Sequence, residues 1–257
     1  MCLILIALNQ HPLYPIIILS NRDEFYNRAT TPAHYWKDAP YLFAGQDLVG
    51  SGTWLGIAKN GAFSCVTNYR NPKIYNSSLL SRGLLVKEFL LNSATTPASD
   101  YIKKIIPVAN QYNPFNLLVG TLDEILYYSN VENKMKKLSS GLYGLSNHLL
   151  NTPWYKVKRA KELFNKVHNQ LIACDVPEQL SELLFPILAD KTQAPDDLLP
   201  HTGVSLELEK SLSSIFITLP AQAYGTRNST LILFKKDTIF FSEKTDKGIQ
   251  TEVQWKL

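Results

Sequence analysis

Apolar residues form dense runs at both ends of the chain. Residues 2–8 and 14–20 are rich in leucine and isoleucine, and residues 9–12 between them are turn formers. Neither run alternates with polar residues, so both are predicted to be strands of one hairpin, buried on both faces of a sheet. A tight turn would place Cys2 opposite Leu19, with room for a slip of one or two residues.

The rest of the pattern predicts further strands and a group of helices. Asn60-Gly61 is a favoured hairpin turn and predicts a second hairpin over residues 53–68. The other predicted strands cover residues 115–121, 125–129, 213–219, 229–235, 238–243 and 249–255. The predicted helices cover residues 79–91, 99–111 and 154–173, and a fourth begins near Asp175. Pro107 should end or kink the second helix, and the lysines of the third should form a solvated face.

The order of these elements predicts an α+β fold. Hairpins at both ends with helices between them do not follow the strand–helix alternation of a doubly wound sheet. Mainly antiparallel sheets with helices on their outer faces fit better. No linker, repeat or shift in composition marks a boundary, so residues 1–257 are predicted to form a single domain.

Composition and charge exclude several classes of protein. The 257 residues are 45% hydrophobic and 19% charged, and 26 Lys and Arg against 22 Asp and Glu leave a net charge of only +4. This balance does not indicate a nucleic-acid partner. No apolar stretch approaches 18 residues, so no transmembrane segment is expected. The apolar N-terminus lacks a basic leader and a cleavage site, and the three cysteines form no disulfide framework, which together predict a cytoplasmic protein.

Metal and cofactor motifs are missing from the sequence. The five histidines have no ligand spacing, and no zinc or covalent haem motif is present. We therefore predict no metal site and no required cofactor. His148 is the histidine to follow, because it comes directly after Asn147, which is singled out below.

The chemistry with the most specific pattern surrounds Cys2. Residues 21–24, with the sequence Asn-Arg-Asp-Glu, follow the second predicted strand at the level of Cys2. They form either an exposed turn or part of a site. If Met1 is removed, Cys2 has both a thiol and an α-amino group, whose pKa near 8 lets it act as a base. Arg22 would favour the thiolate, and Asp23 would hold Arg22 or the amine. The alternative is that Cys2 is an ordinary buried strand residue.

Further motifs follow in order along the chain. They are Ala44-Gly45-Gln46-Asp47, Gly50-Ser51-Gly52-Thr53-Trp54-Leu55-Gly56, Thr67-Asn68-Tyr69-Arg70-Asn71-Pro72, Tyr143-Gly144-Leu145-Ser146-Asn147 and Tyr224-Gly225-Thr226-Arg227-Asn228-Ser229-Thr230. Together with Cys2 and Asn21-Arg22-Asp23-Glu24 they resemble the NRDE family, also called the transport and Golgi organisation family, type two. Only Ser51 and Asn228 depart from the commoner Gly and Ser.

The resemblance implies a fold and a catalytic type. The family is similar to N-terminal-nucleophile (Ntn) hydrolases, which are four-layer α-β-β-α sandwiches, and to their choloylglycine hydrolase and penicillin acylase branch. It implies that Cys2, Arg22 and Asp23 match that branch's N-terminal cysteine, arginine and aspartate. Because the branch separates its arginine and aspartate more widely, Glu24 is the alternative acid.

The resemblance also implies roles for three later residues. Asn68 and Asn147 would form or order an oxyanion hole, and Arg227 would match a late active-site arginine. Each of the three could instead serve only a local turn.

Two functions are compatible with these residues. The first is a cysteine amidohydrolase acting on a linear amide or thioester of a small acylated metabolite. The second, implied by the resemblance, is a non-catalytic carrier or chaperone for haem or acyl-CoA and lipid, with haem as cargo. In both, Asn21, Arg22, Glu24 and Arg227 would contact the ligand.

Overall fold

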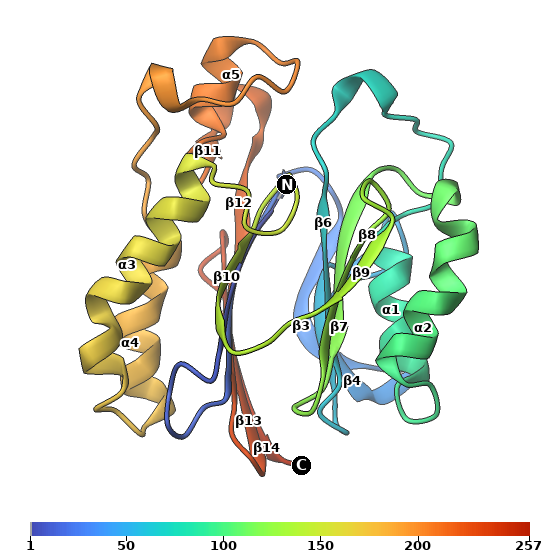
Figure 1. Ribbon diagram of the computed structural model, residues 1–257, viewed down its shortest axis with the longest axis vertical. Coiled ribbons are helices and arrows are strands. Elements are labelled where there is room, and N and C mark those ends of the chain that lie inside the picture. Colours follow the sequence, from blue (N-terminus) through green and yellow to red (C-terminus); the bar gives the residue numbers. More distant parts are fainter. Residues whose placement is uncertain (1) are drawn as a thin grey trace. The chain divides into compact units, whose positions relative to one another are not determined.

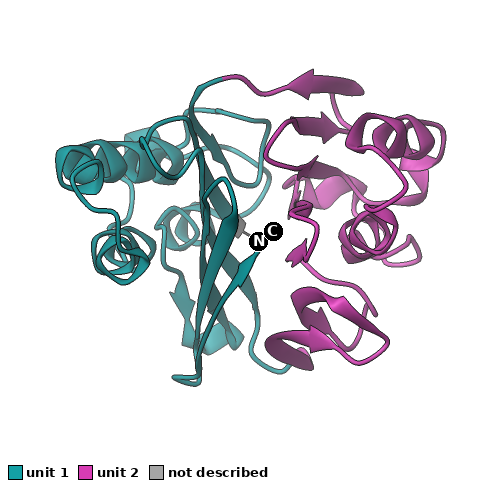
Figure 2. Ribbon diagram, turned by 90° about the horizontal axis from the view of Figure 1, so that it is seen from below, with its two compact units in different colours: residues 1–27, 140–256 teal, residues 28–139, 257 magenta. Residues whose placement is uncertain are grey.

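The chain divides into two compact units that are interleaved in sequence. The computed structural model describes residues 2–257, except the side chain of Cys2, so the expected removal of Met1 lies outside the described residues. Met1–Asn27 and Ser140–Lys256 form unit 1, and Arg28–Ser139 with Leu257 forms unit 2 (Figure 2). The single domain expected from the sequence stays a prediction. None of the described helices is long and apolar enough to span a bilayer.

Unit 1 is an antiparallel sheet with helices on one face (Figure 1). The strand order is β10-β1-β2-β12-β13-β14, with β11 paired to β12. The strands are β1 (Cys2–Leu8), β2 (Ile16–Phe25), β10 (Gly141–Leu145), β11 (Thr218–Leu219), β12 (Tyr224–Phe234), β13 (Thr238–Thr245) and β14 (Gln250–Lys256). The helices are α3 (Tyr155–Leu171), α4 (Pro177–Leu188) and α5 (Leu206–Ser211), with short turns of 3₁₀ helix at Asp196–Leu198 and Pro220–Gln222.

The core of unit 1 lies between this sheet and helices α3 and α4. Alternate residues of β1 and β2, such as Leu5 and Leu19, pack with Phe164 of α3 and Leu184 of α4. Alternation in a strand sends the intervening residues to the other face, and these are also buried. Burial on both faces is therefore confirmed for the first hairpin.

The register of the first hairpin differs from the prediction. Cys2 pairs with Arg22, three residues beyond Leu19. The connection is longer than a tight turn because His11 organises it, with its Nδ1 accepting a hydrogen bond from the N–H of Leu13 at 3.1 Å. The added loop residues shift every cross-strand pair.

Strand β2 also continues further than predicted. Asn21-Arg22-Asp23-Glu24 lies inside the strand and pairs with β12 on its far side. Asn21, Arg22 and Asp23 are 0%, 4% and 1% exposed, so the exposed-turn interpretation is wrong. The strand continues because β12, about two hundred residues away in the sequence, satisfies its backbone hydrogen bonds.

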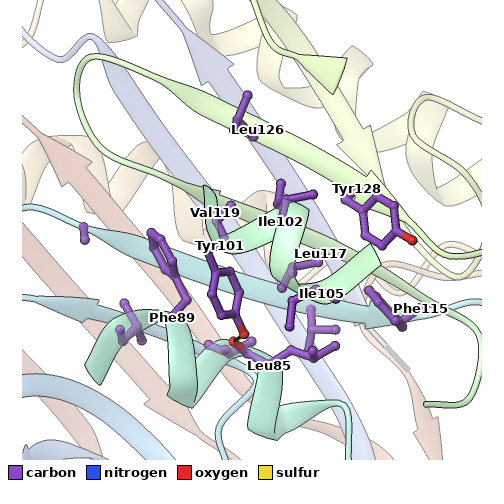
Figure 3. Packing of buried hydrophobic residues seen from close by; sticks show 14 of the residues in the cluster. Leu85, Phe89, Tyr101, Ile102, Ile105, Phe115, Leu117, Val119, Leu126 and Tyr128 are labelled. Atoms are coloured by element: carbon purple, nitrogen blue, oxygen red, sulfur yellow. Dashed lines mark hydrogen bonds between the residues drawn. The ribbon is translucent and has the colours of Figure 1, made fainter. Parts of the chain in front are cut away.

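Unit 2 is a second antiparallel sheet whose strands follow one another in chain order. They are β3 (Thr30–Trp36), β4 (Ala39–Asp47), β5 (Leu55–Ala58), β6 (Phe63–Asn68), β7 (Phe115–Gly120), β8 (Ile125–Ser129) and β9 (Lys134–Lys137). The helices are α1 (Gly83–Asn92) and α2 (Ala98–Ile105), with 3₁₀ turns at Pro72–Ile74 and Ile106–Gln111. Phe89 and Tyr101 of the helices pack on Leu117 and Tyr128 of the sheet (Figure 3).

The sequence predicted the local backbone correctly at positions where a single glycine or proline determines its conformation. Gly61 has φ +84° in the β5–β6 turn, and α2 gives way to a 3₁₀ turn at Ile106, one residue before Pro107. Strands β3 and β4 were not predicted, since their residues show no sustained apolar alternation. The solvated lysine face of α3 needs one correction, because Lys156 is 1% exposed.

Candidate functional site

The candidate site is built around the N-terminal end of β1, which lies between β2 and β10. Cys2 pairs with Arg22 of β2, and Arg22 in turn pairs with Asn228 of β12. On the other side, the last β1–β10 pair is Ile4 with Leu145, and Asn147 follows two residues later. The backbone therefore places Arg22 on the strand at one side of Cys2, and Asn147 in the loop that follows the strand at the other side.

Asn21 anchors this end of the sheet to the helices. Its Nδ2 donates to the carbonyls of Leu188 at 2.8 Å and Ile215 at 2.9 Å, and its Oδ1 accepts from Ser229 Oγ at 2.7 Å. Leu188 is the last residue of α4. Both amide hydrogens are used inside the fold, which indicates a positioning role.

Asp23 holds the β11–β12 hairpin. Its Oδ1 accepts a hydrogen bond from Thr226 Oγ1 at 2.6 Å, and that hydroxyl oxygen accepts from the N–H of Ile217 at 2.9 Å. The hydroxyl of Tyr224 donates to the Asp23 carbonyl at 3.1 Å. The carboxylate thus organises the turn that leads into β12.

Arg22 and Glu24 lie on the opposite face of β2 from Asn21 and Asp23, because successive strand residues alternate. Arg22 Nη2 is 4.0 Å from Glu24 Oε2, and the two side chains are 5% and 25% exposed. Among the acidic residues at this point of β2, Glu24 therefore shares a face with Arg22, although Asp23 is adjacent in sequence.

A β-bulge places Arg227. Asp23 pairs with Thr226 and Arg22 with Asn228, so Arg227 is the extra residue between the two pairs. Its Nη1 donates to the carbonyl of Phe25 at 3.2 Å, and its Nε is 3.5 Å from Asp246 Oδ2. The N–H of Asp246 also donates to the Arg227 carbonyl at 2.8 Å. The bulge thus turns this arginine toward the end of β13.

Arg227 lines a cavity of about 560 Å³ on the helix face of unit 1. The apolar part of its wall includes Phe185, Pro186 and Phe216. Its charged part includes Lys244 and two acidic residues, Glu182 and Asp246. The Lys244 ammonium lies 4.3 Å from the centre of the Phe185 ring. Arg22 is not part of this wall among the described residues. Arg22 and Arg227 therefore serve different faces of the sheet.

Sequence reasoning missed a row of buried polar residues on the face of Arg22. Ser20 pairs with Thr230, which pairs with Glu243, and Arg22 pairs with Asn228 one step along the same face. Glu243 is 1% exposed and accepts from Thr230 Oγ1 at 3.3 Å. Its signal was available in the sequence, because it is a carboxylate on the same face of β13 as the apolar residues Ile239 and Phe241.

Asn147 and His148 lie in the loop after β10. Asn147 is fully buried, and its Oδ1 accepts from Ser146 Oγ at 3.3 Å. His148 Nδ1 lies 2.8 Å from Thr152 Oγ1, and its ring packs 5.5 Å from that of Trp154. The histidine thus braces the loop that carries Asn147.

Asn68 belongs to unit 2, where it ends β6 and pairs with Phe115 of β7. Its oxyanion role stays a prediction. The other two cysteines differ in access, since Cys65 is buried and Cys174 is half-buried. No group of His, Cys, Asp and Glu within the described residues has the arrangement of a metal site.

Comparison with known proteins gives a family and a fold. The family model described as "Transport and Golgi organisation 2" matches residues 1–247. The bovine (Bos taurus) Transport and Golgi organization protein 2 homolog is 33% identical over 264 residues, 96% of this chain and 94% of that protein. The human (Homo sapiens) homolog is 32% identical over 259 residues, 95% of this chain and 93% of its own length.

A solved structure shares the fold. The C2A mutant of conjugated bile acid hydrolase from Clostridium perfringens has a TM-score of 0.55 and 9% sequence identity, covering 98% of this chain and 92% of its own. This structure is an Ntn hydrolase of the α-β-β-α class. At this identity the likeness shows the fold alone, and it confirms the predicted fold class with mainly antiparallel sheets.

Proposed function

The chain belongs to the Transport and Golgi organisation 2 family, and from this premise we propose that it is a cysteine hydrolase whose nucleophile is Cys2 after removal of Met1. Its substrate class is a linear amide or thioester of a small acylated metabolite. The observation that carries the proposal is the burial of Arg22 within β2, directly opposite Cys2 in the strand pairing.

Burial of this kind supports a functional role. Charged side chains are almost never fully buried in a sheet unless they are paired or used, because removing them from water is costly. Here Arg22, Asn228 and Glu243 share one face beside the end of β1. An arginine paired directly opposite a cysteine across two strands favours the thiolate of that cysteine.

The proposed steps use few groups. The Cys2 sulfur attacks the substrate carbonyl carbon while the α-amino group takes the thiol proton. The resulting oxyanion receives a hydrogen bond from Asn147, a type of contact worth about 3 kcal/mol. The ammonium then returns the proton to the departing amine or thiol. Water, deprotonated by the same amine, hydrolyses the thioester formed on Cys2.

Arg22 and its carboxylate neighbours position these groups. We assign Glu24 as the acid that orients Arg22, since both lie on one face of β2. Asp23 and Asn21 hold the surrounding backbone through Thr226 and the end of α4. A cysteine at position 2 also occurs in the bile acid hydrolase, whose solved form is a C2A mutant.

The cavity beside α4 favours one second candidate, the carrier. Its volume falls within the range of small-molecule sites, and its apolar walls suit an apolar ligand such as haem or an acyl-CoA. Arg227 and Lys244 could meet the anionic group of such a ligand, in competition with Glu182 and Asp246 of the same wall. Such a carrier needs Arg227 and tolerates replacement of Cys2.

Reactivity of the cysteines tests the hydrolase first. Brief alkylation at neutral pH, followed by mass mapping, reports both Met1 removal and the relative rates of the thiols. We expect Met1 to be absent and Cys2 to react at least about tenfold faster than half-buried Cys174, which is the internal control. Retained Met1, or equal rates, would contradict the proposal.

Two variants then separate the candidates. Cys2→Ala should abolish turnover of acyl amides and thioesters, and Cys174→Ala should leave it intact. If Cys2→Ala keeps full affinity for haem or an acyl-CoA and Arg227→Gln loses it, while no substrate is turned over by the wild type, the carrier is the function.

A further inference from the structure

One end of unit 2 is unusually apolar for an exposed surface. It is formed by the turn after β4 and the segment between β6 and α1. Its exposed large side chains are Leu48, Val49, Ile74, Tyr75 and Leu80, which we call the loop patch. Val49 and Tyr75 are each 63% exposed. Contiguous exposed apolar surface marks an interaction site more often than scattered single residues do.

Contacts along the backbone place the segments that carry these five residues at one end of unit 2. The β4 turn packs on the start of α1, because a Cβ on Gly50 would lie 2.6 Å from Ser81 Oγ, and Lys87 Nζ donates to the carbonyl of Ser51 at 3.1 Å. This places the turn that carries Leu48 and Val49 beside Ser81, the residue that follows Leu80.

Hydrogen bonds to residues 111–113 hold the segment that carries Ile74 and Tyr75 at the same end of unit 2. The N–H of Leu80 donates to the Gln111 carbonyl at 2.9 Å, and Asn113 exchanges hydrogen bonds of 2.8 and 2.6 Å with the backbone of Asn76. The loop therefore protrudes in a defined position beyond β6 (Figure 1).

The segments that carry the loop patch are predominantly basic, and the exposed Glu88 of α1 directly follows them. Residues 48–87 contain five lysines and arginines and no aspartate or glutamate. Arg70, Lys73, Arg82 and Lys87 belong to this end of unit 2, whereas Lys59 lies in the β5–β6 turn at the other end of the strands. Asp47, just before the stretch, is ion-paired with Arg28 at 2.9 Å.

We propose that the loop patch docks the protein onto a membrane surface rich in anionic lipids. Apolar side chains flanked by lysine and arginine match such a surface, since the apolar groups enter the headgroup boundary while the cations meet lipid phosphates. The described helices include none that could span a bilayer, so the contact is peripheral. A protein partner with an apolar patch would not require the absence of acidic residues over forty positions.

Co-sedimentation of the full-length protein with vesicles tests this proposal. The vesicles contain phosphatidylcholine alone, or phosphatidylcholine with about one third phosphatidylserine. We expect binding to the anionic vesicles only, and weakening when salt is raised from about 0.1 M to about 1 M. Failure to bind phosphatidylserine vesicles at low salt, or equal binding to both vesicles, would overturn the proposal.

Matched variants locate the contact. Lys73→Gln should lower the partition coefficient about fivefold, whereas Lys59→Gln, from the same acid-free stretch at the other end of the strands, should not. Ile74→Ser should lower it about tenfold, whereas Ile249→Ser, an exposed isoleucine of unit 1, should not. If Lys59→Gln and Ile249→Ser lowered the partition coefficient as much as Lys73→Gln and Ile74→Ser, the proposal would be overturned.

A second copy of the chain is the competing occupant. Sedimentation velocity without vesicles distinguishes it, since the membrane proposal expects Ile74→Ser to leave the oligomeric state unchanged. Conversion of an oligomer to monomer by Ile74→Ser would identify a protein interface and overturn the proposal.

Discussion

The two units depart from the usual distribution of side chains in opposite directions. Among the described residues, unit 1 buries charges, including Arg22, Asp23 and Glu243, whereas the buried polar residues of unit 2 are all uncharged. Unit 2 instead exposes a cluster of apolar side chains, including Ile74 and Tyr75. In both units the apolar core is formed by residues of the sheet and of the helices that cover it.

This contrast shows where each unit differs from a simple folding module. A buried charge and an exposed apolar cluster both cost free energy in an isolated fold. The buried charges of β2 lie among the last residues of that strand, whereas the loop patch lies in the connections after β4 and β6, where side chains can reach a surface. The hydrolase proposal therefore rests on unit 1, and the membrane proposal on unit 2.

The largest expected effect concerns the buried amides. Asn21→Ala should lower the free energy of unfolding by about 3 kcal/mol, because it leaves the Leu188 and Ile215 carbonyls and the Ser229 hydroxyl without their partner. The matching amide of unit 2 is Asn116, which bonds Thr67 and Tyr127 side chains. Asn116→Ala should cost about 2 kcal/mol.

Urea denaturation measures both values. If Asn116→Ala lowered the free energy of unfolding more than Asn21→Ala does, the contrast would be broken. The buried amide of unit 1 would then contribute less to stability than that of unit 2.

The next effect concerns activity and depends on the proposed hydrolase. Arg22→Met keeps the apolar stem of the side chain and removes its charge, so the fold should persist while kcat/KM falls about a hundredfold. The control is Arg82→Met in unit 2, a half-buried arginine that donates to the Pro114 carbonyl. Steady-state kinetics and a thermal melt should be run on both. An unchanged rate for Arg22→Met would remove the guanidinium from the mechanism.

A smaller effect, found in both units, is the change of stability with pH that comes from a half-buried aspartate paired with an arginine. Two hydrogen bonds from Arg159, at 2.7 and 2.6 Å, hold the pKa of Asp190 below its usual value. A lowered folded pKa stabilises the protein above the unfolded pKa of about 3.9, and this contribution disappears as pH falls through the folded value. Asp190→Asn should thus cost about 1–2 kcal/mol at pH 7 and progressively less below pH ~4.

Asp47 of unit 2 provides the parallel case. Burial opposes its ionisation, but hydrogen bonds from Arg28 and from the N–H groups of Gly50 and Val49 outweigh burial and lower its pKa. Asp47→Asn should show the same trend in unfolding experiments at pH 3–7. A cost that grows toward acid in either variant would reverse the assigned direction.

The smallest effect should be at the loop patch. Ile74→Ser should change the free energy of unfolding by less than about 0.5 kcal/mol, because the side chain is already exposed. A loss above about 1 kcal/mol would mean that Ile74 packs within unit 2 instead of facing a partner.

Much of the fold was predictable because it depends on local patterns. Dense apolar runs identified the central strands β1 and β12, and three- and four-residue spacing identified α3. Gly61 and Pro107 act through their own backbones. Strands β3, β4, β9 and β10 were not predicted, and pairing with neighbouring strands determines their conformation. Strands β3 and β4 have mixed polar and apolar residues, and β9 is a short exposed run of lysines around Met135.

The sequence predicted which residues belong to the candidate site, but not on which face of the sheet each of their side chains lies. The family resemblance is now confirmed, and the sequence had pointed to Arg22 and Arg227 as residues that contact the same ligand. The β12 bulge instead turns Arg227 to the helix-side cavity, while Arg22 faces the other side with Glu24. Glu243 joined this face only through its pairing with Thr230.

The sequence by itself thus determined the fold class, the family and the local turns, since these follow from periodicity, from motif order and from single-residue backbone preferences. The tertiary structure alone decided that Asn21-Arg22-Asp23-Glu24 is a buried strand and not a surface turn. It also decided which face each charge occupies. The physical reason is that backbone hydrogen bonds from β12, distant in sequence, extend β2 past its apolar run, and one extra residue in that partner reorients Arg227.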